Sequence, residues 1–290
     1  MEQKVNVGLI GTGLMGQPMA LKLLQDGLSV MAYNRTASKL EPLQEAGATI
    51  ADSPATVLKK SECIILMLTN AEAIEETLLN ENTVSLLKDR TLIQMGTISP
   101  QESKAICNQI STAGGAYLEA PVLGSIPQVK TGELIVMVGS SKEQFQKWQS
   151  VLKHYSPEPL YIGTVGTASA MKLALNQLIA GLTATFALTL GFVKRQGVEV
   201  EQFMKVVRES ALYAPTFDKK LSRMEDRNFN NPNFPTKHLL KDVDLFLTQA
   251  RDLGLATDNL EGIKTIIKKA IASNLADGDY SAIYNVINPQ

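Results

Sequence analysis

Hydrophobic positions in the first half of the chain form short continuous runs, and segments with helical spacing separate them. Such runs predict strands of a parallel sheet that is covered on both faces. The predicted strands are Val5–Ile10, Ser29–Tyr33, Cys63–Leu68, Thr91–Gln94, Tyr117–Leu118 and Leu134–Val138. The predicted helices between them include Met15–Gln25, Ala71–Leu79, Pro100–Ala113 and Lys142–Lys153. This alternation indicates a doubly wound α/β domain with right-handed crossovers.

The second half has a different pattern, in which no convincing strand can be recognised. Residues 155–167 carry two prolines and two glycines and are the predicted junction between domains. The predicted helices that follow are Ala168–Val193, 199–210, 236–253 and 258–275, with a loop at Asp226–Lys237. We therefore predict two domains, an α/β domain over residues 1–163 and an all-α domain over residues 164–290, joined by a long central helix.

The long helix is the one segment that resembles a membrane span. Ala168–Val193 has 26 residues with a single charge, Lys172, which is long enough to cross a bilayer. Its many Ala, Thr and Gly residues and the polar cluster of Lys172, Asn176 and Gln177 favour the buried helix of a larger protein, and no membrane association. An ammonium group in such a helix is costly unless it is paired, hydrated or used.

Composition excludes several classes of protein. The 290 residues are 44% hydrophobic and 20% charged, and 28 Lys and Arg against 29 Asp and Glu give a net charge of −1. A near-neutral chain argues against nucleic-acid binding, which requires a basic face. Cys63 and Cys107, with His154 and His238, do not form a metal-ligand pattern, so no metal is implied. The N-terminus shows no signal peptide, and we expect a cytoplasmic protein.

A glycine-rich motif stands between the first strand and the first helix. Gly11-Thr12-Gly13-Leu14-Met15-Gly16 follows the strand VNVGLI and opens an amphipathic helix. In this context the glycines allow a tight turn, close approach of a pyrophosphate, and close packing of helix on strand. The helix N-terminus would supply free N–H groups to the phosphates. The pattern predicts a Rossmann-type dinucleotide-binding domain.

The end of the second strand indicates which dinucleotide is bound. Sites for NAD usually carry Asp or Glu at this point, whereas this chain reads Tyr33-Asn34-Arg35-Thr36. The Arg35 guanidinium and donors from Asn34 and Thr36 suit a 2′-phosphate. We predict NADP(H), with NAD(H) as the weaker alternative. The competing interpretation is that Arg35 is an ordinary solvated residue.

Lys172 and Asn176 are the candidate catalytic residues. They are four residues apart, so they share one face of the long helix. A buried lysine has a lowered pKa and can exchange a proton near neutral pH, and Asn176 can orient the lysine or a substrate oxygen. The alternative is a lysine whose stem extends from the first helical turn to water.

Four motifs together resemble the β-hydroxyacid dehydrogenase family over essentially the whole chain, and its glyoxylate/succinic semialdehyde reductase branch most of all. The motifs are GLIGTGLMGQPMALKL at residues 8–23, Glu119–Ser125, Gly163–Asn176, and the pair Lys241-Asp242. By this resemblance Lys172 is the general acid/base and Asn176 its polar partner. The resemblance further implies that Met67, Leu68, Thr97 and Lys241 bind the cofactor and that Val122, Leu123, Gly124, Ser125 and Asp242 bind substrate.

The second motif departs from the usual family pattern. Most members have Asp followed later by Ser-Gly-Gly, whereas this chain has Glu119 and Leu123-Gly124-Ser125. In the family, a serine at the position of Leu123 hydrogen-bonds the substrate. Leucine cannot form this hydrogen bond, so the resemblance does not assign the family's usual substrate to this chain. Backbone N–H groups of residues 123–125 could still hold a carboxylate as an anion nest.

The resemblance implies hydride transfer between NADP(H) and a small carboxylate-bearing aldehyde, keto acid or hydroxy acid, with Lys172 exchanging the proton. Two alternatives stay open: an imine reductase-like enzyme, against which Lys172 speaks, and a non-catalytic NADP(H)-binding sensor. The apolar helix also needs more cover than three further helices provide. We therefore expect a homodimer or homotetramer, as in the family.

Overall fold

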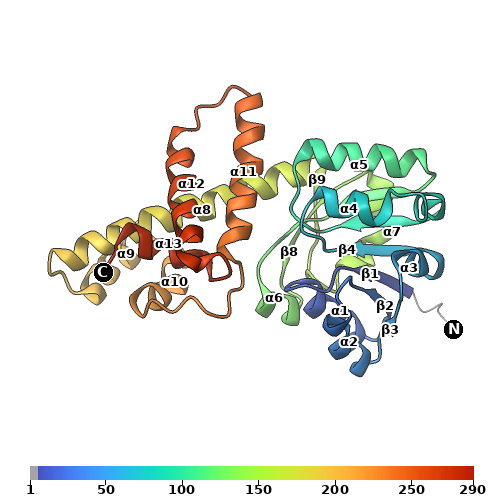
Figure 1. Ribbon diagram of the computed structural model, residues 1–290, viewed down its shortest axis with the longest axis horizontal. Helices are drawn as coiled ribbons and strands as arrows, with labels where there is room; N and C mark the ends of the chain where they lie inside the picture. The colour runs from blue at the N-terminus through green and yellow to red at the C-terminus, as the bar shows by residue number, and fades with distance from the viewer. Residues whose placement is uncertain (1–5) are drawn as a thin grey trace. The chain divides into compact units, whose positions relative to one another are not determined.

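The computed structural model describes residues 6–290, and the chain divides into two compact units, Met1–Lys172 and Leu173–Gln290 (Figure 1). The predicted strand residue Val5 and the N-terminal residues behind the signal-peptide expectation lie outside the described residues. Each unit has its own hydrophobic clusters.

The first unit is built on one sheet, which over residues 6–290 contains nine strands. The strands are β1 (Asn6–Ile10), β2 (Ser29–Tyr33), β3 (Thr49–Ile50), β4 (Cys63–Leu66), β5 (Thr91–Gln94), β6 (Ala116–Glu119), β7 (Val122–Leu123), β8 (Ile135–Gly139) and β9 (Leu160–Gly163). Their order is β3-β2-β1-β4-β5-β6-β8-β7, and β9 pairs with β8. The helices are α1 (Gly16–Gln25), α2 (Glu41–Glu45), α3 (Pro54–Lys60), α4 (Ala71–Leu78), α5 (Pro100–Thr112), α6 (Ile126–Thr131) and α7 (Lys142–Leu152), with 3₁₀ turns η1 (Ala37–Leu40) and η2 (Val84–Leu87).

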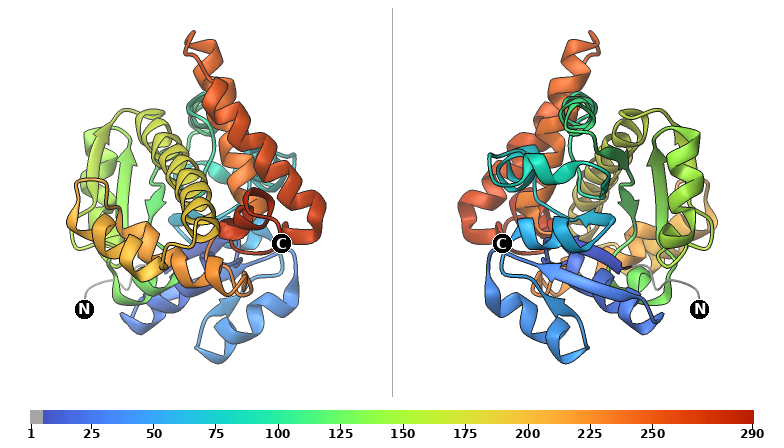
Figure 2. Two further views of the ribbon diagram at one scale, coloured as in Figure 1. Left: turned by 90° about the vertical axis from the view of Figure 1, so that its left-hand side faces the viewer. Right: turned by 90° about the vertical axis from the view of Figure 1, so that its right-hand side faces the viewer.

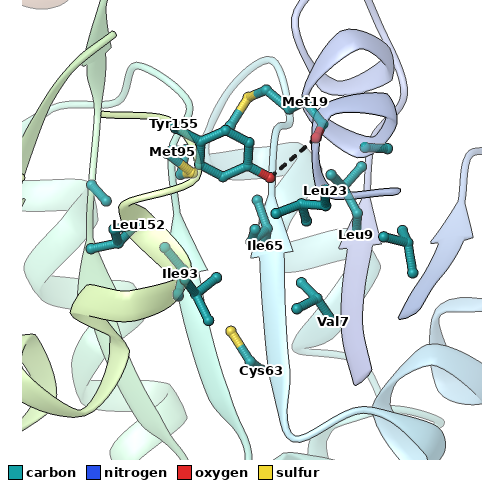
Figure 3. Packing of buried hydrophobic residues seen from close by; sticks show 14 of the residues in the cluster. Val7, Leu9, Met19, Leu23, Cys63, Ile65, Ile93, Met95, Leu152 and Tyr155 are labelled. Atoms are coloured by element: carbon teal, nitrogen blue, oxygen red, sulfur yellow. Dashed lines mark hydrogen bonds between the residues drawn. The ribbon is translucent and has the colours of Figure 1, made fainter. Parts of the chain in front are cut away.

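Successive strand residues bury their side chains on opposite faces of this sheet. On one face Val7 and Leu9 pack with α1 and with Tyr155, whose hydroxyl donates to the carbonyl of Met19 at 3.3 Å (Figure 3). On the other face Ile10 packs with side chains of α3, α4 and α5. A sheet covered on both faces explains the continuous apolar runs of the sequence, and it confirms the predicted doubly wound domain.

The sheet departs from the predicted parallel arrangement at one edge. The sheet is parallel from β3 to β6, but β8 runs antiparallel to both β6 and β7. Strands β3, β7 and β9 were missed because two of them contain only two residues and the third is exposed at the predicted junction.

The second unit is helical, as the sequence predicts. Its elements are α8 (Thr167–Arg195), which begins in the first unit, α9 (Val200–Glu209), α10 (Pro215–Glu225), α11 (Thr236–Asp252), α12 (Asp258–Ala270) and α13 (Ile283–Ile287), with a π-helical turn η3 (Ile271–Leu275) and a 3₁₀ turn η4 (Tyr280–Ala282). Helices α10 and α13 were not predicted. The predicted helix over 258–275 is α-helical to Ala270 and continues as the π-helical turn η3, within which Asn274 adopts a left-handed conformation with φ of 61°. Between residues 164 and 290 the described chain has one isolated β-bridge, Pro235 to Asp279.

Helices α11 and α12 lie side by side (Figures 1 and 2) and form the centre of a cluster that includes Leu239, Val243, Leu260 and Ile267. These side chains recur at helical spacing, which explains why both helices were predicted.

Helix α8 is not buried on every side. By length and composition it could cross a membrane, and 44% of its most apolar window is buried. Leu178, Leu188 and Phe192 are 54%, 62% and 63% exposed, whereas Ala180, Ala187 and Leu190 are fully buried. One side of the predicted buried helix is thus covered within the chain and one apolar stripe is exposed, as expected for a helix that needs more cover than its own domain provides.

Candidate functional site

The glycine-rich turn of the first unit has the shape that a dinucleotide requires. Gly11 has a φ of 97°, in the region that favours glycine, and its N–H donates to Tyr33 O at 2.9 Å. A Cβ at Gly11 would overlap the carbonyl of Met67, and a Cβ at Gly16 would overlap the carbonyl of Gly11. Both positions therefore require glycine for close packing of turn, strand and helix.

The space beside the same turn fits a phosphate. A Cβ at Gly13 would meet no atom within 4 Å, so the backbone is open to approach there. Helix α1 has no side-chain cap at Met15 and no acidic residue in its first turn. Its N-terminal N–H groups and positive dipole end remain suited to an anion. The residues present fit the phosphates of a dinucleotide.

Asn34, the residue after β2, connects the glycine-rich turn to the segment that follows β2. Its Oδ1 accepts from Thr12 N at 3.1 Å, and its Nδ2 donates to Thr36 O at 3.0 Å. One amide hydrogen of Asn34 remains for a ligand. The side chains of Arg35 and Thr36 are exposed. Asn34 thus has a structural role in the turn that the sequence reasoning did not include.

Lys39 was missed as a candidate. It lies in η1, and its carbonyl oxygen is 3.5 Å from both Thr12 Oγ1 and Gln17 Nε2, so the η1 backbone adjoins the glycine-rich turn. The sequence signal that could have identified Lys39 is its position as a second basic residue, four positions after Arg35.

The predicted cofactor residues Met67 and Leu68 follow β4 and lie against the glycine-rich turn. A Cβ at Gly11 would be 3.0 Å from Leu68 Cδ2, and one at Gly16 would be 3.4 Å from Met67 Cβ. Thr97 follows β5, the parallel neighbour of β4, and is half-buried. The carboxyl ends of β1, β4 and β5 meet at one sheet edge, the usual place for a ligand in such folds.

The predicted substrate segment, residues 122–125, contains β7 and a sharp turn. Gly124 has a φ of 132°, and a Cβ there would clash with Leu134. The N–H and the hydroxyl of Ser125 both donate to Gln128 Oε1, at 3.0 and 2.9 Å. A carboxylate bound by the predicted nest would therefore use the other amides of the segment or displace the Gln128 side chain.

The two candidate catalytic residues lie on α8, as predicted. Lys172 is half-buried, and Asn176 is 3% exposed. In the second unit Asn176 Nδ2 donates to Asp242 Oδ2 at 2.6 Å, and Lys241 Nζ forms an ion pair with Asp242 Oδ1 at 2.7 Å. No hydrogen bond reaches Asn176 Oδ1 within the described chain. An acceptor-only carboxylate thus fixes the amide, and the amide oxygen stays available as an acceptor.

Replacing Asp242 by asparagine tests this arrangement. The carboxylate of Asp242 offers one oxygen to Asn176 Nδ2 and the other to Lys241 Nζ, whereas an asparagine side chain has only one oxygen. Its NH₂ group would face one of these two donors, and a buried donor would then lack an acceptor. We expect the free energy of unfolding to fall by about 1–3 kcal/mol. Urea unfolding measures this change, with the exposed Asp252→Asn variant, on the same helix, as control. Equal losses in both variants would contradict the interpretation.

His238 predicts an acid-sensitive step in stability. Burial lowers the pKa of His238 below its usual 6.5, and the nearby Lys241 charge lowers it further. The unfolded chain then binds the proton more readily, so this stability is complete above pH 6.5 and is lost as the pH falls below it. Urea unfolding at about pH 7.5 and about pH 5.5 should give a larger loss in the wild type than in a His238→Gln variant. The same loss in both proteins would assign the acid sensitivity to other groups.

Comparisons with known proteins agree with this geometry. Residues 6–163 match the family described as the NAD binding domain of 6-phosphogluconate dehydrogenase. Residues 166–287 match the NAD-binding region of NADP-dependent 3-hydroxyisobutyrate dehydrogenase.

Individual relatives cover nearly the whole chain. Glyoxylate/succinic semialdehyde reductase 1 of Arabidopsis thaliana is 29% identical and aligns over 98% of both chains. The chloroplastic reductase 2 of the same plant is 30% identical over 98% of this chain and 79% of its own. The structure of Mycobacterium tuberculosis 3-hydroxyisobutyrate dehydrogenase with L-serine shares the fold with a TM-score of 0.88, at 19% identity over 98% of this chain and 99% of the other. The glycine-rich turn, the two-part fold and these matches establish that the chain belongs to the β-hydroxyacid dehydrogenase family, whose members are NAD(P)-dependent oxidoreductases acting on CH–OH groups.

Proposed function

We propose that the protein is an NADPH-dependent reductase of small aldehydes or keto acids that carry a carboxylate. The observation that carries the proposal is the pair Lys172 and Asn176, one helical turn apart on α8, with the Asn176 amide held by Asp242. Membership of the family supplies the reaction class, and the names of the Arabidopsis relatives suggest semialdehyde or glyoxylate substrates.

The preference for NADPH rests on the end of β2. No carboxylate stands where an NAD-binding site holds the ribose 2′-hydroxyl, because Asn34 occupies that place. Arg35 and Thr36 are exposed and free of competing acidic partners on this turn, and Lys39 adds a second positive charge. A 2′-phosphate gains charge-assisted hydrogen bonds from such a set.

Lys172 would act as the general acid. When bound, the nicotinamide supplies the hydride in reduction and accepts it in oxidation. Lys172 donates a proton from its Nζ to the developing alkoxide and takes it back in the oxidative direction. Asn176 Oδ1, the available acceptor, holds the lysine ammonium or a substrate hydroxyl in place. Residues 122–125 bind the carboxylate through their amides, and Leu123 selects among substrate side chains by its apolar bulk.

The remaining assignments extend this proposal. Met67, Leu68 and Thr97 would flank the cofactor, and residues 1–163 would form its binding domain. Residues 164–290 would serve substrate binding and self-association, through the stripe of α8 that contains Leu178, Leu188 and Phe192. A dimer or tetramer covers this stripe, and we propose a cytoplasmic location. Sedimentation at micromolar concentration checks the association, and a lone monomer would refute it.

Oxidation of NADPH at 340 nm tests the function directly. We would offer glyoxylate, succinic semialdehyde, tartronate semialdehyde and methylmalonate semialdehyde, with NADH as the comparison. Turnover of one aldehyde, with higher kcat/KM for NADPH than for NADH, supports the proposal. Tight NADPH binding without turnover of any of the four would refute it in favour of an imine substrate or a sensing role.

A further inference from the structure

Glu119 is a fully buried carboxylate whose position the proposed reaction does not explain. It is the last residue of β6 and is 0% exposed. Its Oε1 accepts from the N–H groups of Gly166 at 2.8 Å, Ala168 at 2.9 Å and Ser169 at 3.1 Å. Its Oε2 accepts from the hydroxyl of Ser169 at 2.6 Å and from the hydroxyl of Ser103. Five donors surround one side chain, which matches an acceptor-only carboxylate.

These contacts show that Glu119 caps the N-terminus of α8. The first N–H groups of a helix have no partner within the helix, and a nearby side chain of the same segment usually accepts from them. Here the acceptor comes from a strand, about fifty residues away in the sequence. A negative charge at this end is also favoured by the helix dipole. The burial of a carboxylate is thus offset by hydrogen bonds and by the field of the helix.

The fold also keeps room for this side chain. Glu119 pairs with Gly139 across the antiparallel strands β6 and β8. A Cβ at Gly139 would overlap Glu119 Oε1. The absence of a side chain at Gly139 therefore leaves the space that the Glu119 carboxylate occupies.

The cap joins two segments that carry predicted site residues. On the strand side, Glu119 precedes the segment 122–125 by one Ala-Pro pair. On the helix side, Ala168 and Ser169 lie one turn before Lys172. A helical side chain lies back over the turn that precedes its own Cα, so the stem of Lys172 runs over the turn that Glu119 holds.

We propose that Glu119 is a positioning residue, which fixes the first turn of α8 on β6 and thereby sets the place of the Lys172 ammonium relative to the substrate segment. Its catalytic consequence rests on the proposed function, in which Lys172 donates the proton. Its geometric part concerns the first unit alone and does not depend on turnover.

The kinetic test compares Glu119→Gln, Ser169→Ala and the control Ser141→Ala. Ser141 caps α7 through the N–H of Gln144 at 3.2 Å, so its loss removes a similar hydrogen bond from a helix without a predicted catalytic residue. We expect Glu119→Gln to lower kcat about 100-fold, the order of loss for a misplacement of about 1 Å. KM for the aldehyde and Kd for NADPH should change less than about twofold, since the variant still binds both ligands and loses only the alignment of Lys172. Ser169→Ala should fall between Glu119→Gln and the control.

A second measurement separates this proposal from the proposed function. Trace acetylation of the native protein with acetic anhydride, followed by peptide mass spectrometry, reports the reactivity of Lys172 without any substrate. We expect this reactivity to change in Glu119→Gln and Ser169→Ala and to stay at the wild-type value in Ser141→Ala. If the wild type reduces no aldehyde but this pattern holds, the function fails and the positioning role stands.

Two results would overturn the proposal. One is unchanged Lys172 acetylation in Glu119→Gln while hydrogen exchange at residues 166–169 accelerates, which makes Glu119 a cap and nothing more. The other is a kcat that falls equally in Ser141→Ala. If Glu119→Gln does not fold, Ser169→Ala and Glu119→Asp, which keeps the charge on a shorter side chain, decide the question by the same acetylation readout.

Discussion

Replacement of Lys172 by alanine is expected to lower kcat for aldehyde reduction by about 10²–10⁴-fold, the contribution typical of a positioned general acid. The variant removes the proton donor of the proposed reaction and leaves the glycine-rich turn of residues 11–16 unchanged. Binding of NADPH, followed by quenching of protein fluorescence, should therefore stay near the wild-type value. Stopped-flow single turnovers measure the loss at the chemical step.

The control for this experiment is Lys194→Ala. Lys194 lies on the same helix α8, near its C-terminal end, where its Nζ is 3.6 Å from Glu225 Oε1. The Lys194→Ala substitution removes the same charge at a position outside the proposed catalytic site, so full activity is expected. Wild-type kcat in Lys172→Ala would remove the lysine from the mechanism, and the imine reductase alternative would then become the stronger one.

Replacement of Asn34 by aspartate is expected to shift the coenzyme preference from NADPH toward NADH. Aspartate keeps an oxygen that accepts from Thr12 N, so the contact with the glycine-rich turn should remain, whereas the hydrogen bond to Thr36 O is lost. The new charge repels a 2′-phosphate and accepts a hydrogen bond from a free 2′-hydroxyl, as in sites for NAD. A hydrogen bond to a charged group is worth about 1.5–3 kcal/mol, so the ratio of kcat/KM values should change by roughly tenfold to hundredfold.

Asn82→Asp is the matched control, because Asn82 is exposed in the same unit and the substitution adds the same charge. Its coenzyme ratio should equal that of the wild type. An Asn34→Asp variant with an unchanged ratio would mean that Asn34 serves only the turn, through Thr12 and Thr36, and that the preference is set elsewhere.

The sequence predicted those features whose signal is local. Strand β1, the glycines at 11 and 16 and the start of α1 stand next to one another, so motif and context can be recognised together. The α/β and helical halves follow from hydrophobic periodicity in the same way. The family membership was likewise predicted, because its motifs are short and ordered along the chain.

Features that depend on distant contacts were beyond such reasoning. The cap that Glu119 provides joins residues 119 and 169, and the sequence near either residue does not indicate a contact with the other. The pairing of Asn176 with Asp242 also required the structure. Strand β7 has only two residues, too few for a periodic pattern, and its existence depends on β8 as a partner.

The reversed edge of the sheet has a consequence for how substrate range can change in descendants of this protein. The connection that leads into the proposed substrate segment is held at both ends by a single strand, since β8 pairs with β6 at Glu119 and with β7 at Val122. An insertion or deletion between these points would shift one pairing against the other and turn β7 side chains to the opposite face. The number of residues between these pairings is therefore expected to stay constant, whereas exchange of the side chain at position 123 leaves both strand pairings intact. Divergence in substrate is thus expected to proceed by point substitution within a segment of constant length.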